Sequence, residues 1–304
     1  KLGGIMQIWL KGKNTEINLN GGRENSMHVN PDLEGFSGLP EIRTSQGVNI
    51  GMDGGWTGEQ NFEARFLSII GVIADQDIAV VEQKRRELFA LLAEKRLLLR
   101  YVTDAGNTYT TNVVVLGVVS SIGALRQKAQ YKLNLKADDP LWYDYGGGSG
   151  IVATLQIGKP EGGFRFPVTF PLIIAGGGSQ YTTVKNTGTS AIDPVITIFG
   201  PIHQPKVIDQ TTNQFMQILA DLTANDVVIM NTHLKTIVQV DKAAYDEAVA
   251  NGAKPTGTDI YYLKSDGSTF IKLASGDNKL ALTSAVTSDT GRATVRFSSG
   301  FMGI

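Results

Sequence analysis

The stretch from residue 75 to residue 101 constrains the fold most, because it predicts a long amphipathic helix that runs directly into a buried strand. Asp75 and Asp77 stand where a helix takes its N-terminal cap and its first-turn carboxylates. From residue 78 onward the apolar side chains recur at helical spacing on one face, namely Ile78, Val81, Leu88, Phe89 and Leu92. We predict a helix over residues 75–95, then a strand over 97–102 that opens a hairpin through residues 104–107.

One basic residue, Arg85, lies inside the apolar face of this predicted helix. Its aliphatic stem could pack while the guanidinium reaches water. Alternatively, the guanidinium pairs with a carboxylate, for instance on a neighbouring subunit. Both interpretations stay open, and the second makes Arg85 our candidate residue for a subunit interface. On the opposite face, Glu82 and Arg86 are spaced i, i+4 and are expected to pair.

The composition describes a globular chain of 304 residues, 42% hydrophobic and 19% charged, which is long enough for two domains. The formal net charge of −1 without a long basic run argues against a general nucleic-acid or membrane-surface partner. The absence of cysteine excludes disulfides and thiolate metal sites. No segment approaches the roughly 20 apolar residues of a membrane span, and no signal peptide is evident.

The first half of the chain predicts short strands around the helix. Strands are expected over residues 5–10, 15–19 and 108–119, and alternation predicts two more over 62–70 and 131–136. In the strand over 62–70, Phe66 and Ile70 are assigned to the apolar side and Arg65 to the other side. Residues 21–58 read as one long loop rich in Gly, Asn, Pro and Ser, and loops of this length are usually functional or ordered by a partner.

The second half predicts a run of short strands typical of a β-sandwich. They are expected over residues 151–157, 180–184, 195–199, 215–219, 227–231, 236–240, 280–285 and 293–297, with a hairpin of 259–264 and 269–273. A short helix over 243–250 is capped by Asp241. We place the domain boundary at the glycine-rich residues 146–150, so that the domains span 1–145 and 146–304.

No constellation of residues predicts catalysis, so we expect no enzyme, no metal site and no cofactor. The three histidines lie in separate segments, at positions 28, 203 and 233. The glycine runs at 146–150 and 176–178 lack the remainder of a P-loop. Asp138 and Asp139 precede Pro140 and are expected to form a turn, since neighbours on an extended chain point to opposite faces. Two β-rich domains for binding or assembly remain.

Several segments together resemble the distal tail protein family of long-tailed, siphophage-type bacteriophages. The first-half matches are the loop Gly35-Phe36-Ser37-Gly38-Leu39-Pro40-Glu41-Ile42-Arg43, the strand 62–70, the helix–hairpin unit, and Tyr131-x-Leu133-x-Leu135-x-Ala137-Asp138-Asp139-Pro140. The second-half matches are Asp193 to Pro201, Pro205 to Ile208, Leu222 to Thr232, and Leu273-x-x-Gly276-x-Asn278-x-Leu280. No single motif is specific, but their order and spacing support the resemblance.

The resemblance implies a structural virion protein with two mainly β domains. The first would be a β-sandwich or split-barrel domain with one α-helix, forming a hexameric ring. The second would be a galectin-like antiparallel β-sandwich. Implied partners are further copies of the chain, the tail tube protein, the tail-tip hub or tail-associated protein, and a receptor-binding protein. The location would be the tail tip or baseplate of the virion, after assembly in the host cytoplasm.

An alternative function is a carbohydrate- or receptor-binding module of the tail tip, with the second domain as the binder. Sugar sites usually combine an exposed aromatic ring with polar neighbours. In the second half Tyr181, Tyr261 and Tyr262 are candidates, and exposure beside polar groups would favour this alternative. A tail-associated hydrolase would need paired carboxylates in a pocket or a histidine-activated nucleophile, and neither is predicted.

Overall fold

The computed structural model describes residues 6–21, 26–123, 127–144, 150–157, 181–286 and 288–304. The chain forms two compact units. Unit 1 contains residues 1–145 and 301–304, and unit 2 contains residues 146–300. The last four residues therefore pack with unit 1, although the sequence placed them in the second half. Residues 146–149 of the glycine run at 146–150, and the glycine run at 176–178, lie outside the described residues.

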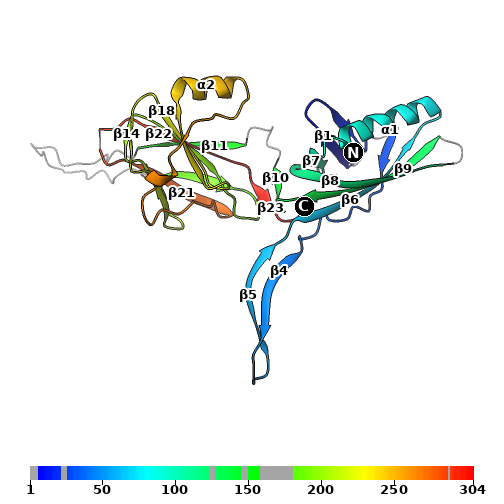
Figure 1. Ribbon diagram of the computed structural model, residues 1–304, viewed down its shortest axis with the longest axis horizontal. Helices are drawn as coiled ribbons and strands as arrows, with labels where there is room; N and C mark the ends of the chain where they lie inside the picture. Colours follow the sequence, from blue (N-terminus) through cyan, green and yellow to red (C-terminus); the bar gives the residue numbers. More distant parts are fainter. Residues whose placement is uncertain (1–5, 22–25, 124–126, 145–149, 158–180, 287) are drawn as a thin grey trace, which may run out of the picture. The chain divides into compact units, whose positions relative to one another are not determined.

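Unit 1 is built on a nine-stranded sheet with the order β2-β1-β7-β8-β9-β6-β3, in which β10 pairs with β8 and with β23 (Figure 1). The strands of this sheet are β1 Gln7–Lys11, β2 Glu16–Asn18, β3 Met27–Val29, β6 Arg65–Ala74, β7 Arg96–Val102, β8 Thr108–Ile122, β9 Lys128–Ala137, β10 Trp142–Asp144 and β23 Gly300–Phe301. The predicted helix is α1 Ile78–Leu92. It covers one side of the sheet and buries Val81, Leu88, Leu91 and Leu92.

The helix begins later and ends earlier than its sequence pattern indicated. Asp77 is the N-cap, and its carboxylate accepts the Ala79 N–H at 2.8 Å. Asp75 instead accepts the Asp77 N–H and the Ser26 hydroxyl. Ile78, predicted to be buried, is 40% exposed because the first turn extends beyond the sheet core. The expected Glu82–Arg86 pair is present at 3.5 Å on the exposed face.

The strand β6 reverses the predicted inward face. Arg65, Leu67 and Ile69 point inward and are at most 2% exposed, whereas Phe66 and Ile70 are 54% and 40% exposed. Apolar residues stand at both odd and even positions here, so alternation alone did not decide which set faces α1. Pairing with β9, which places Ile69 beside Leu133, decides it.

Two further expectations for unit 1 are corrected. The predicted long loop over 21–58 contains β3 and most of a two-stranded ribbon formed by β4 Ile42–Val48 and β5 Gly55–Phe62. In the strand predicted over 108–119, the uninterrupted apolar run Val113 to Leu116 indicates burial on both faces or nearly so, yet Leu116 is 55% exposed. It stands at a register shift between Val115 and Gly117 that turns its side chain outward.

Unit 2 contains two main antiparallel sheets, as expected for a β-sandwich. The six-stranded sheet has the order β11-β22-β13-β18-β19-β20 and the four-stranded sheet the order β12-β21-β15-β16, while β14 pairs with β17. Their bounds are β11 Ile151–Gln156, β12 Thr182–Asn186, β13 Val195–Phe199, β14 Ile202–His203, β15 Lys206–Asp209, β16 Gln214–Gln217, β17 Asp221–Leu222, β18 Asp226–Asn231, β19 Thr236–Asp241, β20 Thr258–Asp259, β21 Gly276–Thr283 and β22 Arg292–Phe297.

The short helix of unit 2 is confirmed, and one predicted hairpin is wrong. The helix α2 Lys242–Ala250 is capped by Asp241, which accepts the N–H groups of Ala243 and Ala244. Residues 259–264 do not pair with 269–273. They form the end of β20 and a 3-10 helix, η3 Tyr261–Leu263. Backbone bonds take both segments elsewhere, since Leu219 N–H donates to Leu263 and Thr269 N–H donates to Phe215.

Candidate functional site: an exposed ribbon and its arginine anchor

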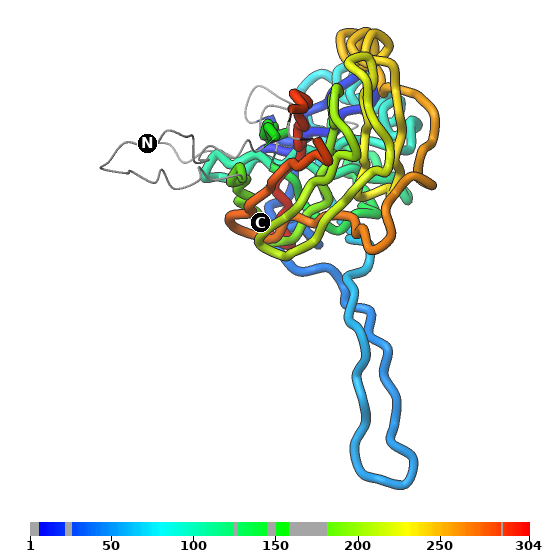
Figure 2. The backbone as a smooth tube through the Cα atoms, turned by 90° about the vertical axis from the view of Figure 1, so that its left-hand side faces the viewer, coloured from blue at the N-terminus to red at the C-terminus, as the bar shows by residue number. Residues whose placement is uncertain are grey.

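The β4–β5 ribbon is a sheet of only two strands, and it extends away from the rest of unit 1 (Figures 1 and 2). Ile42 pairs with Phe62 at its base and Gly47 with Trp56 farther along, with a register shift between them. The Trp56 ring lies over Gly47, where a Cβ atom would come within 2.6 Å of it. An aromatic ring covering a glycine on the partner strand is one way to hold such a pair.

The ribbon exposes large apolar side chains along its whole length. Val48, Ile50 and Met52 are 81%, 100% and 73% exposed, and Trp56 is 54% exposed. Ile42 and Phe62 at the base are 49% and 40% exposed. An isolated two-stranded hairpin is marginally stable in water, and contiguous exposed apolar side chains usually mark an interaction site. The ribbon is therefore the strongest candidate for a protein-binding element in unit 1.

Arg65 anchors the ribbon at its base. Its Nη1 donates to the carbonyl oxygens of Gly35 and Gly38, each at 2.7 Å. Its Nε donates to Pro140 O at 3.0 Å, and its Nη2 donates to Met302 O. One buried guanidinium thus joins three separate segments of unit 1 to the start of β6, immediately after the ribbon. Burial lowers the pKa of Arg65, but an arginine remains charged at neutral pH.

The anchor also requires a glycine in the facing loop. Gly35 has a φ of +81°, and a Cβ atom at this position would lie 2.0 Å from the Phe66 carbonyl oxygen. Only glycine combines this backbone conformation with this approach. Arg65 was not among the candidate residues from the sequence. Its position between the two motifs around residues 35–43 and 131–140 could have singled it out.

The predicted interface residue Arg85 lies half-buried on α1. Its guanidinium carbon is 5.0 Å from the centre of the Phe89 ring, a cation–π contact within its own helix. Its Nε is buried without a hydrogen-bond partner. No salt bridge to Arg85 is found within the described residues, so the structure does not bring Arg85 together with the ribbon or with an acid of its own chain. Its interface role stays a prediction.

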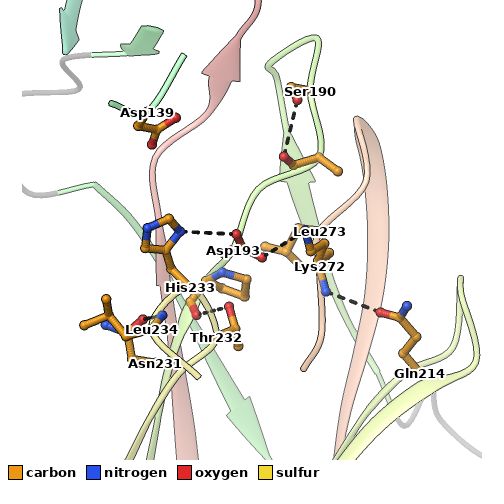
Figure 3. A network of polar contacts seen from close by, with 12 residues as sticks. Asp139, Ser190, Asp193, Gln214, Asn231, Thr232, His233, Leu234, Lys272 and Leu273 are labelled. Atoms are coloured by element: carbon orange, nitrogen blue, oxygen red, sulfur yellow. Dashed lines mark hydrogen bonds and ion pairs between the residues drawn. The ribbon is translucent and has the colours of Figure 1, made fainter. Parts of the chain in front are cut away.

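In unit 2, Asp193 is the centre of a small polar network (Figure 3). Its carboxylate lies 3.4 Å from His233 Nδ1 and 3.7 Å from Lys272 Nζ. Beside it, the Thr232 hydroxyl donates to Pro194 O at 2.7 Å. These contacts join the start of β13, the turn after β18 and the segment before β21. The network contains no nucleophile beside a base, so it supports the fold and suggests no reaction.

The second histidine of unit 2, His203, forms a buried-carboxylate pair. Its Nδ1 lies 2.8 Å from Asp289 Oδ1, and its backbone N–H donates to Oδ2 of the same carboxylate. The Asp289 side chain is 6% exposed and also accepts a bond from the Ser284 hydroxyl. The hydrogen bond to Asp289 raises the pKa of His203. Burial would raise the pKa of Asp289, but bonds from Ser284 and His203 lower it.

We expect this pair to make the stability of unit 2 depend on pH. The pKa of His203 is raised on folding. The stability that this histidine contributes is therefore complete at a pH below its pKa in the unfolded chain, about 6.5, and is lost as the pH rises through its pKa in the folded protein. The pKa of Asp289 is lowered on folding, so the stability that its carboxylate contributes is present at neutral pH and is lost as the pH falls through the lowered pKa. The unfolding midpoint of unit 2 in wild type should therefore exceed that of His203→Gln more at pH 6 than at pH 8. A difference independent of pH would contradict the pairing.

The remaining candidates from the sequence show no catalytic arrangement. In the described part of the chain, no group of three or more His, Asp or Glu side chains could hold a metal ion. Asp138 pairs with Lys136 at 2.8 Å, and Asp139 accepts the Leu141 N–H and the Tyr143 hydroxyl. These are turn contacts, as predicted. Neither of the two α-helices among the described residues has the length and apolarity to cross a membrane.

Comparison with known proteins gives a match of fold. No family model matches the sequence, and no curated protein matches it. Among solved structures, the SPP1 Dit protein, described as a paradigm of the hub adsorption apparatus in phages that infect Gram-positive bacteria, superposes with a TM-score of 0.62 at 16% identity. The match covers 98% of this chain and 99% of that one. The phage p2 baseplate in its activated conformation with Sr matches over 96% of the chain at a TM-score of 0.47 and 11% identity.

The match extends over both units of this chain. The resemblance read from the ordered sequence motifs is thus confirmed at the level of structure. The chain has the two-domain, mainly β fold of a phage Dit protein along nearly its whole length.

Proposed function

We propose that the chain is a structural component of a bacteriophage tail that assembles into a homo-hexameric ring at the distal end. Unit 1 forms the ring, and unit 2 is the galectin-like domain. The ring connects the tail tube protein to the tail-tip hub of the baseplate, where a receptor-binding protein is a further partner. The protein acts through assembly and has no enzymatic role.

The observation that carries this proposal is the ribbon of exposed apolar side chains in unit 1. The exposure of four large apolar side chains on this ribbon is best explained by a partner that covers them. They are Val48, Ile50, Met52 and Trp56. The fold shared with the SPP1 Dit protein indicates the kind of assembly. A ring needs a heterologous contact, in which two different surfaces of one protomer meet on neighbouring copies and the rotation closes.

Light scattering after gel filtration, repeated over a range of concentrations, tests the ring. The chain mass is 32.7 kDa. A closed hexamer is expected at roughly 196 kDa, and two stacked rings at twice that mass. A monomer at every concentration would contradict self-assembly of the isolated chain.

The interface role of Arg85 has its own test. If Arg85 pairs with a carboxylate of a neighbouring copy, Arg85→Ala should raise the concentration at which the ring dissociates by about tenfold, which corresponds to about 1.4 kcal/mol. The matched control is Arg86→Ala on the exposed side of the same helix, which should leave the mass profile unchanged. An Arg85→Ala ring as stable as the wild-type ring would restrict Arg85 to its contact with Phe89.

A second candidate function is sugar or receptor binding by unit 2. Tyr262 is 79% exposed and Tyr261 is 43% exposed, and the carboxylate of Asp259 lies beside them, bonded to the Tyr261 N–H. Tyr181 is a weaker candidate because the Lys279 ammonium lies 4.9 Å from the centre of its ring. Binding of a sugar on a glycan array that is lost in Tyr262→Ala would support this function, while an array without any signal would oppose it.

A further inference from the structure

The nine-stranded sheet of unit 1 has a second side, on which several described side chains are exposed. At its centre, three strands present outward the set that we call the outer sheet face: Phe66 and Ile70 from β6, Lys132 and Lys136 from β9, and Leu116 and Val119 from β8. Strand pairing places Ile70, Lys132 and Val119 in one row across the face. Phe66, Leu116 and Val119 are 54%, 55% and 67% exposed. Four large apolar side chains thus flank a central basic strand.

This face is hollowed where the chain bulges. A depression of about 410 Å³ lies between Phe66 and Leu116, with Asn134 and Gly117 in its lining. No atom lies within 4 Å of a Cβ placed on Gly117, so the floor there is open. A second depression of about 300 Å³ is lined by Ile70, Val72 and His28, among others. The face therefore has the relief to receive side chains as well as the apolar area.

The β4–β5 ribbon carries a matching apolar side. Side chains alternate along a strand, and Ile42 pairs with Phe62, so these two lie on one side of the ribbon. Val48, six residues after Ile42 on β4, lies on the same side, whereas the register shift in the ribbon turns Trp56 to the opposite side. Ile50 and Met52 add apolar groups at the tip, where they are 100% and 73% exposed.

The charges of the two surfaces are complementary. The outward residues of β9 are basic at positions 128, 132 and 136, while those of β6 and β8 across the face are uncharged. Two acidic residues lie near this basic strand. Glu34 lines the larger depression, and Asp138 pairs with Lys136. Residues 41–63 carry four acidic side chains, Glu41, Asp53, Glu59 and Glu63, against the single basic Arg43. An acidic, apolar ribbon thus fits a basic, apolar face.

We propose that the outer sheet face of one copy binds the β4–β5 ribbon of a second copy. The ribbon joins β6 directly and extends away from its own sheet, so it covers the face of a neighbour (Figures 1 and 2). The two surfaces differ, which makes the contact heterologous and able to close into a ring. This inference rests on the proposed ring and names the surfaces that form it.

Cysteine crosslinking tests the contact, because the chain has no cysteine of its own. Gln60→Cys lies on the apolar side of the ribbon, and Val119→Cys lies on the outer sheet face. With a short bis-maleimide, the double variant should give a ladder of covalent oligomers. Each single variant should give no ladder beyond a dimer. The matched control pairs Gln60→Cys with Val249→Cys on the exposed face of α2, and should not crosslink.

The outcomes separate this contact from the ring itself. An oligomer by light scattering without a ladder, or with an equal ladder from the control pair, overturns the contact and leaves the ring standing. A wild-type chain that stays monomeric at every concentration overturns both. A ladder specific to the Gln60–Val119 pair supports both.

A charge reversal gives an independent readout. Lys132→Glu should raise the dissociation concentration of the oligomer about tenfold, and added salt should shrink this difference because it screens the repulsion. The control Lys254→Glu, on an exposed residue of unit 2, should have no effect. A Lys132→Glu oligomer that dissociates like the wild type would contradict the proposal.

Discussion

Replacing Arg65 by alanine is expected to destabilise unit 1 by about 3–5 kcal/mol, because hydrogen bonds from a charged donor are worth more than neutral ones and their buried acceptors are left unsatisfied. Arg65 is 2% exposed, and its guanidinium donates to four backbone carbonyls, those of Gly35, Gly38, Pro140 and Met302. The loss should detach the C-terminal residues from unit 1 and loosen the base of the ribbon.

The tryptophans allow this loss to be measured in unit 1 alone. All three, Trp9, Trp56 and Trp142, belong to unit 1, and Trp142 is fully buried beside Arg65. Tryptophan fluorescence during urea unfolding therefore reports this unit. The midpoint of Arg65→Ala should fall well below that of wild type. Arg65→Lys should recover only part of the difference, because an ammonium group cannot match the guanidinium geometry.

The control for this experiment is Arg86→Ala, which removes an arginine whose side chain is 81% exposed. Its free energy of unfolding should change by less than about 0.5 kcal/mol. An Arg65→Ala protein with the wild-type midpoint would show that water replaces the guanidinium without cost, and would remove the anchoring role.

Replacing Asn278 by alanine is expected to destabilise unit 2 by about 2–4 kcal/mol, since a fully buried amide with all its bonds made is lost. Its Oδ1 accepts the Ala274 N–H at 2.9 Å, and its Nδ2 donates to Ala274 O at 2.9 Å and to Gly276 O at 3.1 Å. These bonds hold the turn that starts β21, where Gly276 has a φ of +96°. The turn is part of a sequence motif that supported the family resemblance.

Because unit 2 lacks tryptophan, hydrogen exchange measured by mass spectrometry is the suitable readout. Peptides covering residues 273–283 should lose protection in Asn278→Ala, while the fluorescence transition of unit 1 stays in place. Asn225→Ala, at an exposed position in the turn before β18, is the matched control and should preserve protection. Unchanged exchange in Asn278→Ala would mean that the backbone bonds of β21 alone maintain the turn.

Local sequence signals determined those elements that depend on neighbouring residues along the chain. The periodicity of residues 78–92 predicted α1, Asp241 predicted the cap of α2, and the alternation of residues 131–136 predicted the buried side of β9. Helix caps and single-face alternation are local properties, so they need no knowledge of the partner. The order of the motifs along the chain also indicated the fold shared with the SPP1 Dit protein.

Tertiary structure alone decided the features on which the candidate site depends. β6 has apolar residues at both alternate positions, so packing against α1 and β9 chose Leu67 and Ile69 over Phe66 and Ile70. The same choice turned Arg65 inward toward carbonyls from segments up to 237 residues away. The ribbon was not predicted because its glycines and exposed apolar residues do not form the alternating apolar and polar pattern of a strand with one buried face. The surfaces proposed for ring assembly depend on contacts between residues that are far apart in the sequence. No short window of sequence contains such contacts.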